Sequence, residues 1–227
     1  MSEMQAPAIV SAVSRSPRVD RVGLATLYLG DCREIAPTLE RTGAVVTDPP
    51  YGIARVWKGG GGNGWGKAHA QSEARNDWDD LPLGGVPLDL VLGLGKQHVV
   101  WGGNYFPLPP SRCWLVWNKP ERGFTLAEAE FAWTSLDNVA RVFDAPRSEP
   151  DRVHPTQKPV ALMKWSVSKV KGSIIDPFMG SGTTGVAAVQ MGRPFVGIER
   201  DAGWFSTACR RIEQAQCQAD MFVQVPA

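Results

Sequence analysis

Metal-ligating side chains are scarce in this sequence. It contains three histidines and four cysteines, and no two cysteines stand in a C-x-x-C pair. Structural metal sites usually draw on such closely spaced ligands, so the sequence argues against a bound metal. Four scattered cysteines in a chain of this size also suit a reducing compartment better than a disulfide scaffold, and we therefore expect a cytoplasmic protein.

Long apolar runs are missing as well, and the net charge is close to zero. No stretch approaches the about 20 apolar residues that a membrane-spanning helix needs, and the N-terminus has no apolar signal core. A net charge of +1 excludes bulk attraction to a polyanion, so any nucleic-acid contact requires a local basic patch. The length of 227 residues suits one domain. Because residues 1–22 are rich in Ser, Pro and Arg, we predict a flexible tail there and a single domain over 23–227.

What is present is an alternation of apolar strands with helices. The run GAVVT at 43–47 is typical of a strand buried on both faces of a parallel sheet. Two neighbouring segments, 129–135 and 138–143, are predicted to form an antiparallel pair. The pattern predicts an α/β fold with a mainly parallel, twisted sheet that carries an antiparallel hairpin. Further strands are expected at 24–29, 97–101, 112–117, 173–176 and 194–199, and helices at 33–40, 81–95, 159–170, 183–192 and 203–215.

A glycine-rich turn, DPFMGSGTTGVAA, follows a predicted strand and precedes a predicted helix. Its glycines, Gly180, Gly182 and Gly185, would let a ligand approach the backbone, and Glu199 closes the next strand, where an acid accepts hydrogen bonds from ribose hydroxyls. This arrangement predicts a nucleotide-type cofactor. Only residues 200–227 follow that acid, so the other strands must come from upstream. This permuted order disfavours a nicotinamide-dependent dehydrogenase.

The tetrapeptide DPPY comes directly after the buried strand at 43–47. The amino nitrogen of a nucleobase is a poor nucleophile, because its lone pair is delocalised into the ring. A carboxylate from Asp48 and the carbonyl of Pro49 would accept its two N–H groups, aim the lone pair and stabilise the arriving positive charge. Pro49 and Pro50 restrict the backbone, and Tyr51 offers a face on which a flipped-out base can stack. The tetrapeptide therefore favours amino-group methylation.

Together, DPPY, DPFMGSGTT and HPTQKP resemble the DNA amino-methyltransferases that use S-adenosylmethionine, in the permuted order of the beta class. The resemblance spans residues 24 to about 213. It implies a Rossmann-like methyltransferase fold with circularly permuted motif order, S-adenosylmethionine as cofactor and double-stranded DNA as partner. It also implies direct transfer to a flipped-out adenine, by a restriction–modification or solitary enzyme of a bacterial cell or a phage. A homodimer is a candidate assembly.

The resemblance also assigns cofactor contacts residue by residue. Asp31 would contact the adenine ring of the cofactor and Glu199 its ribose, while Thr156 and Lys158 could reach the methionine carboxylate. The alternatives are that Asp31 caps the helix that follows it and that Lys158 is a solvated first-turn residue. The methionine part would be lined by Asp176, Phe178, Gly180, Ser181, Gly182 and Thr183.

Two further segments carry candidate DNA contacts. The glycine-rich stretch 52–77 interleaves basic and aromatic residues, which suits phosphates and unstacked bases, so we predict a mobile DNA-contact loop; an unstructured insertion is the alternative. The interval 136–153 lies where permuted relatives place target recognition, and its shortness predicts a short or degenerate site. The candidates are Arg55, Lys58 and Lys67 in the loop and Arg141, Arg147 and Arg152 in the interval.

Several other functions remain as alternatives. Cytosine-N4 transfer poses the same chemical problem to Asp48; in the resembling family an Asp before Pro-Pro is commoner in adenine enzymes, which favours adenine. A methyltransferase of glutamine side chains or RNA bases would use related chemistry. A catalytically silent DNA-binding subunit is disfavoured by the intact DPPY, and a dehydrogenase would have to bind a nicotinamide cofactor.

Overall fold

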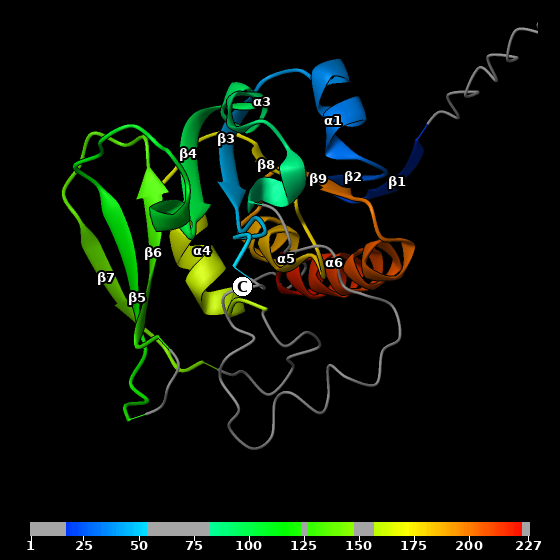
Figure 1. Ribbon diagram of the computed structural model, residues 1–227. Helices are drawn as coiled ribbons and strands as arrows, with labels where there is room; N and C mark the ends of the chain where they lie inside the picture. Colours follow the sequence, from blue (N-terminus) through cyan, green and yellow to red (C-terminus); the bar gives the residue numbers. More distant parts are fainter. Residues whose placement is uncertain (1–16, 54–81, 124–126, 148–156, 224–227) are drawn as a thin grey trace, which may run out of the picture.

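One mixed sheet organises the described part of the chain, in the order β1-β2-β9-β8-β3-β4-β6-β5-β7 (Figure 1). The computed structural model describes residues 17–53, 82–123, 127–147 and 157–223. The strands are β1 (Arg18–Val22), β2 (Ala25–Leu29), β3 (Thr42–Thr47), β4 (Gly95–Trp101), β5 (Trp114–Asn118), β6 (Ala129–Thr134), β7 (Arg141–Asp144), β8 (Ile174–Asp176) and β9 (Phe195–Glu199). This arrangement confirms the predicted α/β class with its mainly parallel sheet.

The middle of the sheet is parallel, from β2 through β9, β8 and β3 to β4. The apolar run of β3 explains its central place, because Ala44, Val45 and Val46 are completely buried, and alternate residues of a strand face opposite sides. Strand β6 runs antiparallel to both β4 and β5.

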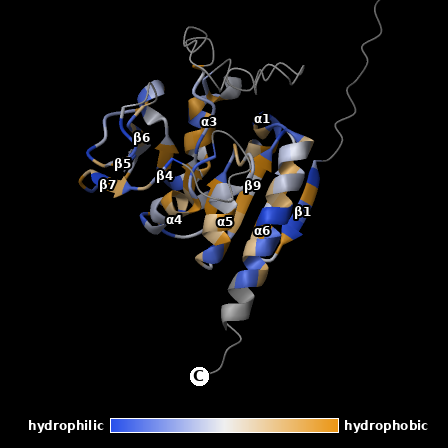
Figure 2. Ribbon diagram, turned by 90° about the horizontal axis from the view of Figure 1, so that it is seen from below, coloured by the Kyte–Doolittle hydropathy of each residue, from blue (hydrophilic) through white to orange (hydrophobic). Residues whose placement is uncertain are grey.

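Helices cover both faces of the sheet. On one face lie α1 (Cys32–Ile35) and α3 (Leu88–Gly93), and on the other lie α4 (Val160–Ser168), α5 (Thr183–Gln190) and α6 (Ala202–Val223) (Figure 1). Each face has its own apolar core. Helix α5 is buried from its first residue to Val189, since α4 and α6 flank it. Figure 2 accordingly shows α5 as largely hydrophobic, whereas hydrophilic residues run along α6.

A crevice follows from the chain's path. Helix α3, which lies between β3 and β4 in the sequence, packs on one face, and α5, which lies between β8 and β9, packs on the other. The neighbouring parallel strands β3 and β8 are therefore followed by helices on opposite faces of the sheet. In open parallel sheets, ligands bind at such a switch point, outside the carboxyl ends of the strands.

Two expectations are wrong in detail. Residues 18–22, assigned to a loose tail, form β1, which pairs antiparallel with β2. The segments 129–135 and 138–143 do not pair with each other: β7 joins β5 in parallel, and β6 separates β5 from β4. Both errors have the same cause. Local sequence favours an extended chain, whereas the partner of each strand is decided by distant segments.

Within the described ranges, no helix is long and apolar enough to cross a membrane, and no three His, Cys, Asp or Glu side chains gather as metal ligands would. All four cysteines are free.

Candidate active site

A cavity of about 500 Å³ opens at the carboxyl ends of the parallel strands. This volume lies within the usual range for small-molecule sites. Of the residues predicted to bind cofactor or to act on the amine, those that line it are Asp31, Asp48, Pro50, Lys158, Asp176, Phe178, Gly180, Ser181, Thr183 and Glu199. The structure thus brings the DPPY turn and the glycine turn to one crevice.

The glycine turn is fixed by its own neighbours. Gly180 and Gly182 have φ angles of 52° and 83°, which residues with a side chain rarely adopt. The carboxylate of Glu199 accepts the backbone N–H of Gly180 at 2.9 Å and that of Asp201 at 2.7 Å. Burial raises the pKa of Glu199. From α6, Arg211 donates to the carbonyl of Ser181 at 2.6 Å, so the turn is held from both sides.

Asp176 joins the two turns rather than lying free in the cavity. Its carboxylate accepts the hydroxyls of Thr47 and Thr184, each at 2.6 Å, and the N–H of Phe178 at 3.0 Å. Its side chain is buried, and this burial outweighs the hydrogen bonds and raises the pKa of Asp176 to about 6. Because Thr47 precedes Asp48 directly, this contact ties the end of β3 to the end of β8.

Asp31 caps helix α1 and also lines the cavity. Its carboxylate accepts the backbone N–H of Arg33 at 2.8 Å and pairs with the guanidinium of the same residue. The side-chain hydrogen bond from Arg33 lowers the pKa of Asp31. The helix-cap alternative is therefore confirmed, and the lining position is compatible with a second role toward a ligand.

Tyr51 is held against the carboxylate of Asp48. Its hydroxyl donates to Asp48 at 2.6 Å, and its ring stacks on Tyr105 with centroids 5.1 Å apart. The ring lies against Gly102, whose φ is 68°; a Cβ at that position would lie 2.1 Å from a ring carbon. The carbonyl of Pro50 accepts the N–H of Leu83 at 2.8 Å, which fixes the turn further. One face of the ring is thus already occupied by an aromatic neighbour.

Lys158 does not lie in solvent, as the alternative for it supposed. Its side chain is only 7% exposed, and Nζ donates to both oxygens of Asp48 at 2.8 Å and to the hydroxyl of Tyr51 at 2.9 Å. It also pairs with Glu130 at 3.1 Å. Burial alone would lower the pKa of Lys158, but the two carboxylates outweigh it and raise that pKa well above its ordinary value.

The predicted DNA contacts are placed only in part. Arg55, Lys58, Lys67 and Arg152 lie outside the described residues, as does most of the predicted 52–77 loop. The predicted cofactor contact Thr156 also lies outside them.

The two remaining candidates differ in their surroundings. Arg141 is exposed at the start of β7. Arg147 donates to the carbonyl of Ala127 at 2.8 Å and its N–H binds Glu121, so it holds two loops together.

Sequence reasoning missed several residues of this site. Thr47 and Thr184 adjoin the two motifs, and the repeated threonine in GSGTT was the available signal. Glu130, Tyr105 and Arg211 offered none, because each reaches the site from an element far away in the sequence.

The DPPY turn and the glycine turn meet at one crevice of a permuted α/β sheet. This arrangement is the Rossmann-like methyltransferase fold. The DNA methylase family model matches residues 101–209. Among curated proteins, the type II methyltransferase M2.DpnII of Streptococcus pneumoniae is 44% identical over 63 residues, which are 26% of this chain and 24% of that protein. The alignment thus spans about a quarter of this relative's length.

Solved structures share the fold over most of the chain. The M1.HpyAVI–SAM complex covers 83% of this chain and 98% of its own, with a TM-score of 0.56 and 22% identity. The PvuII DNA methyltransferase, described as cytosine-N4-specific, covers 89% and 93%, with a TM-score of 0.55 and 16% identity. The resemblance predicted from the motifs, to S-adenosylmethionine-dependent DNA amino-methyltransferases, is confirmed.

Proposed function

We propose that this protein transfers a methyl group from S-adenosylmethionine to the exocyclic amino group of adenine in double-stranded DNA. The observation that carries this proposal is the position of Asp48. Its carboxylate lines the same cavity as the glycine turn and Glu199, so an amine acceptor and a nucleotide-type site share one space.

The residues of the glycine turn fit the cofactor. Glu199 uses each carboxylate oxygen for one backbone N–H, and each oxygen keeps a lone pair that a ribose hydroxyl can use. Asp31 lines the adjoining wall, and Asp176 keeps the turn in place. When bound, S-adenosylmethionine supplies an electrophilic methyl group on a sulfonium.

Asp48 and the backbone of the DPPY turn act on the amine. The carboxylate accepts one N–H of the incoming amino group, and the carbonyl of Pro49 accepts the other, which directs the nitrogen lone pair. Positive charge grows on the nitrogen as the new bond forms, and a fixed carboxylate stabilises that charge without having to reorient. Tyr51 supplies a ring beside the entering base.

Adenine is favoured over cytosine by the Asp that opens DPPY. The fold does not separate the two, since one similar structure is described as cytosine-N4-specific. The test is incubation with duplex DNA and S-adenosylmethionine, followed by mass spectrometry of the digested nucleosides. We expect N6-methyladenine; N4-methylcytosine in its place would contradict the adenine assignment, and no methylated nucleoside would contradict the whole proposal.

The site on DNA is expected to be short. The interval 136–153 contains β7, which belongs to the sheet, and leaves few side chains for reading base pairs. Arg141 is the exposed candidate within the described part of this interval. Each good side-chain contact discriminates against a wrong base pair by about 1–3 kcal/mol, so few contacts specify few positions.

A further inference from the structure

Charged side chains of alternating sign meet behind the DPPY turn. Asp48 follows β3, Lys158 precedes α4, Glu130 lies on β6 and Lys119 follows β5. Lys158 pairs with both Asp48 and Glu130, and Glu130 also pairs with Lys119. The two ammonium-bearing side chains are only 7% and 5% exposed. The amine chemistry proposed above uses Asp48 alone and gives no reason for the other three.

Burying such groups is costly, because charges removed from water lose hydration that only good partners replace. Each of the four groups is paired with an opposite charge. Burial would raise the pKa of Glu130, but the ammonium groups of Lys158 and Lys119 outweigh it and lower that pKa to about 2. Glu130 is therefore charged at neutral pH, and the alternation of sign prevents any member of the network from being an isolated buried charge.

The hydrogen bonds leave one acceptor position on Asp48. A carboxylate offers about four lone-pair positions. The Tyr51 hydroxyl and Lys158 Nζ both donate to Oδ1, and Nζ also donates to Oδ2. One position on Oδ2 remains for an incoming N–H. Since Nζ touches both oxygens, it also prevents the carboxylate from rotating.

We propose that Lys158 is a positioning residue for methyl transfer, which fixes the orientation of the Asp48 carboxylate, and that Glu130 positions Lys158. This inference rests on the proposed function, in which Asp48 receives the amine. An ammonium bound to Asp48 alone would cancel the negative charge that stabilises the transition state. Glu130 on the other side of Nζ offsets that cancellation, so Asp48 is held without losing its effect.

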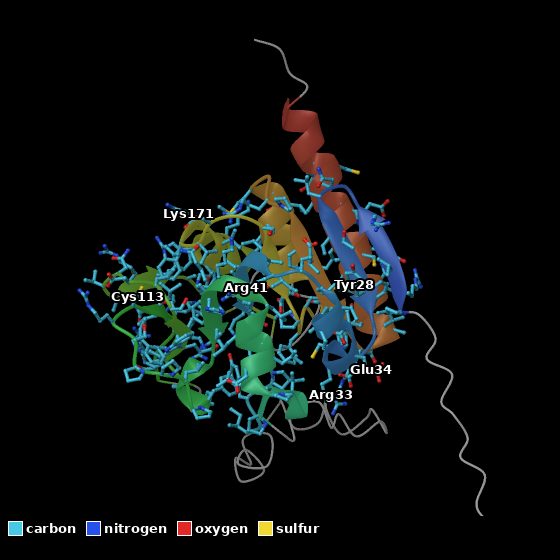
Figure 3. All side chains as sticks on the ribbon, turned by 90° about the horizontal axis from the view of Figure 1, so that it is seen from above. Tyr28, Arg33, Glu34, Arg41, Cys113 and Lys171 are labelled. Carbon is cyan, nitrogen blue, oxygen red and sulfur yellow. The ribbon has the colours of Figure 1, made fainter. Side chains whose placement is uncertain are left out.

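The test compares Lys158→Met and Glu130→Gln with Lys171→Met, an exposed lysine at the periphery of the molecule (Figure 3). Single-turnover methylation rates are measured at saturating cofactor, S-adenosylmethionine affinity by calorimetry, and the free energy of unfolding in urea. For Lys158→Met we expect the rate to fall by roughly tenfold or more at unchanged cofactor affinity, because a carboxylate that is free to rotate no longer offers the amine a fixed acceptor.

Glu130→Gln should slow the reaction several-fold, less than Lys158→Met, since Lys158 still contacts Asp48. Both variants should bind the cofactor as the wild type does, and Lys171→Met should match the wild type throughout. A tenfold loss of cofactor affinity in Lys158→Met would overturn the proposal and place the ammonium on the methionine carboxylate. Rates that fall only in step with a lower free energy of unfolding would also overturn it and assign the network a purely structural role.

The two proposals fail differently. Full turnover in Asp48→Ala would contradict the proposed function itself. An inactive Asp48→Ala beside wild-type behaviour of Lys158→Met and Glu130→Gln would contradict only the positioning role. If Lys158→Met does not fold, the nearly isosteric Glu130→Gln decides the question through its rate.

Discussion

The two ends of the crevice are built in different ways. At the glycine-turn end, most bonds join residues close in sequence: Asp176 and Thr184 are 8 apart, and Gly180 and Glu199 are 19 apart. The bond from Thr47 to Asp176 is the exception, and it ties this end to the DPPY end. At the DPPY end, Lys158 reaches Asp48 across 110 residues. The first end is built mainly from the chain between β8 and α6, whereas the second exists only once the whole sheet has assembled. Changes at the two ends should therefore separate cofactor binding from methyl transfer.

The largest expected effect is that of Asp48→Ala. Loss of the carboxylate that stabilises the transition state should lower the methylation rate by ~10²–10³-fold or more. Cofactor affinity should change little, because the glycine turn and Glu199 lie at the other end. Rate assays measure the methylation rate, and calorimetry measures the cofactor affinity. A comparable loss of cofactor affinity would contradict the separation of cofactor binding from methyl transfer.

The next effect concerns pH and stability, through Asp176. The pKa of Asp176 in the folded protein, about 6, lies above the ordinary value of 3.8. The contribution of Asp176 to stability is therefore fully present below pH 3.8 and is lost as pH rises through about 6. Relative to the wild type, Asp176→Asn should therefore gain on the order of 3 kcal/mol in unfolding free energy between about pH 4 and about pH 7.

Urea unfolding at several pH values measures this gain, and Asp137→Asn is the control, because the Asp137 side chain is 89% exposed. The stability contribution of Glu130, at the other end, depends on pH in the opposite direction. The pKa of Glu130 is lowered to about 2, so its contribution is present above the ordinary glutamate pKa and is lost as pH falls toward 2. A constant difference between Asp176→Asn and the wild type would contradict the raised pKa.

Glu199→Ala should weaken cofactor binding roughly tenfold or more, since charge-assisted hydrogen bonds contribute about 1.5–3 kcal/mol. The rate at saturating cofactor should fall much less than in Asp48→Ala. Calorimetry measures the affinity, and Glu213→Ala on the exposed side of α6 serves as the control. Unchanged cofactor affinity would show that Glu199 only stabilises the glycine turn through its backbone hydrogen bonds.

The smallest effect is expected for Gly102→Ala. The new methyl group would meet the ring of Tyr51, displace it and break its bond to Asp48, so turnover should fall several-fold at unchanged cofactor affinity. Gly192→Ala is a matched control, because Gly192 has a similar φ of 65° and nothing within 4 Å of its Cβ position. Equal losses of activity in both variants would indicate backbone strain, which costs about 1–2 kcal/mol, rather than displacement of the ring.

The features that could be predicted from the sequence are mainly those that depend on local sequence, as at the glycine-turn end. Most strands, most helices and the glycine turn were predicted because each depends on a short stretch: apolar runs of period 2, glycines before a helix, an acid at a strand end. The prediction of cofactor-lining residues was similarly local, and Asp31, Asp176 and Glu199 do line one cavity.

The sequence by itself determined the permuted order of strands and helices and the two turns that carry the chemistry. Only the tertiary structure decided that β1 extends the sheet, that β7 joins β5, and that Lys158 and Glu130 stand behind Asp48. Strand pairing and buried ion pairs connect segments far apart in the chain, so they depend on which surfaces meet when the sheet closes. No single stretch of sequence contains both partners of such a contact.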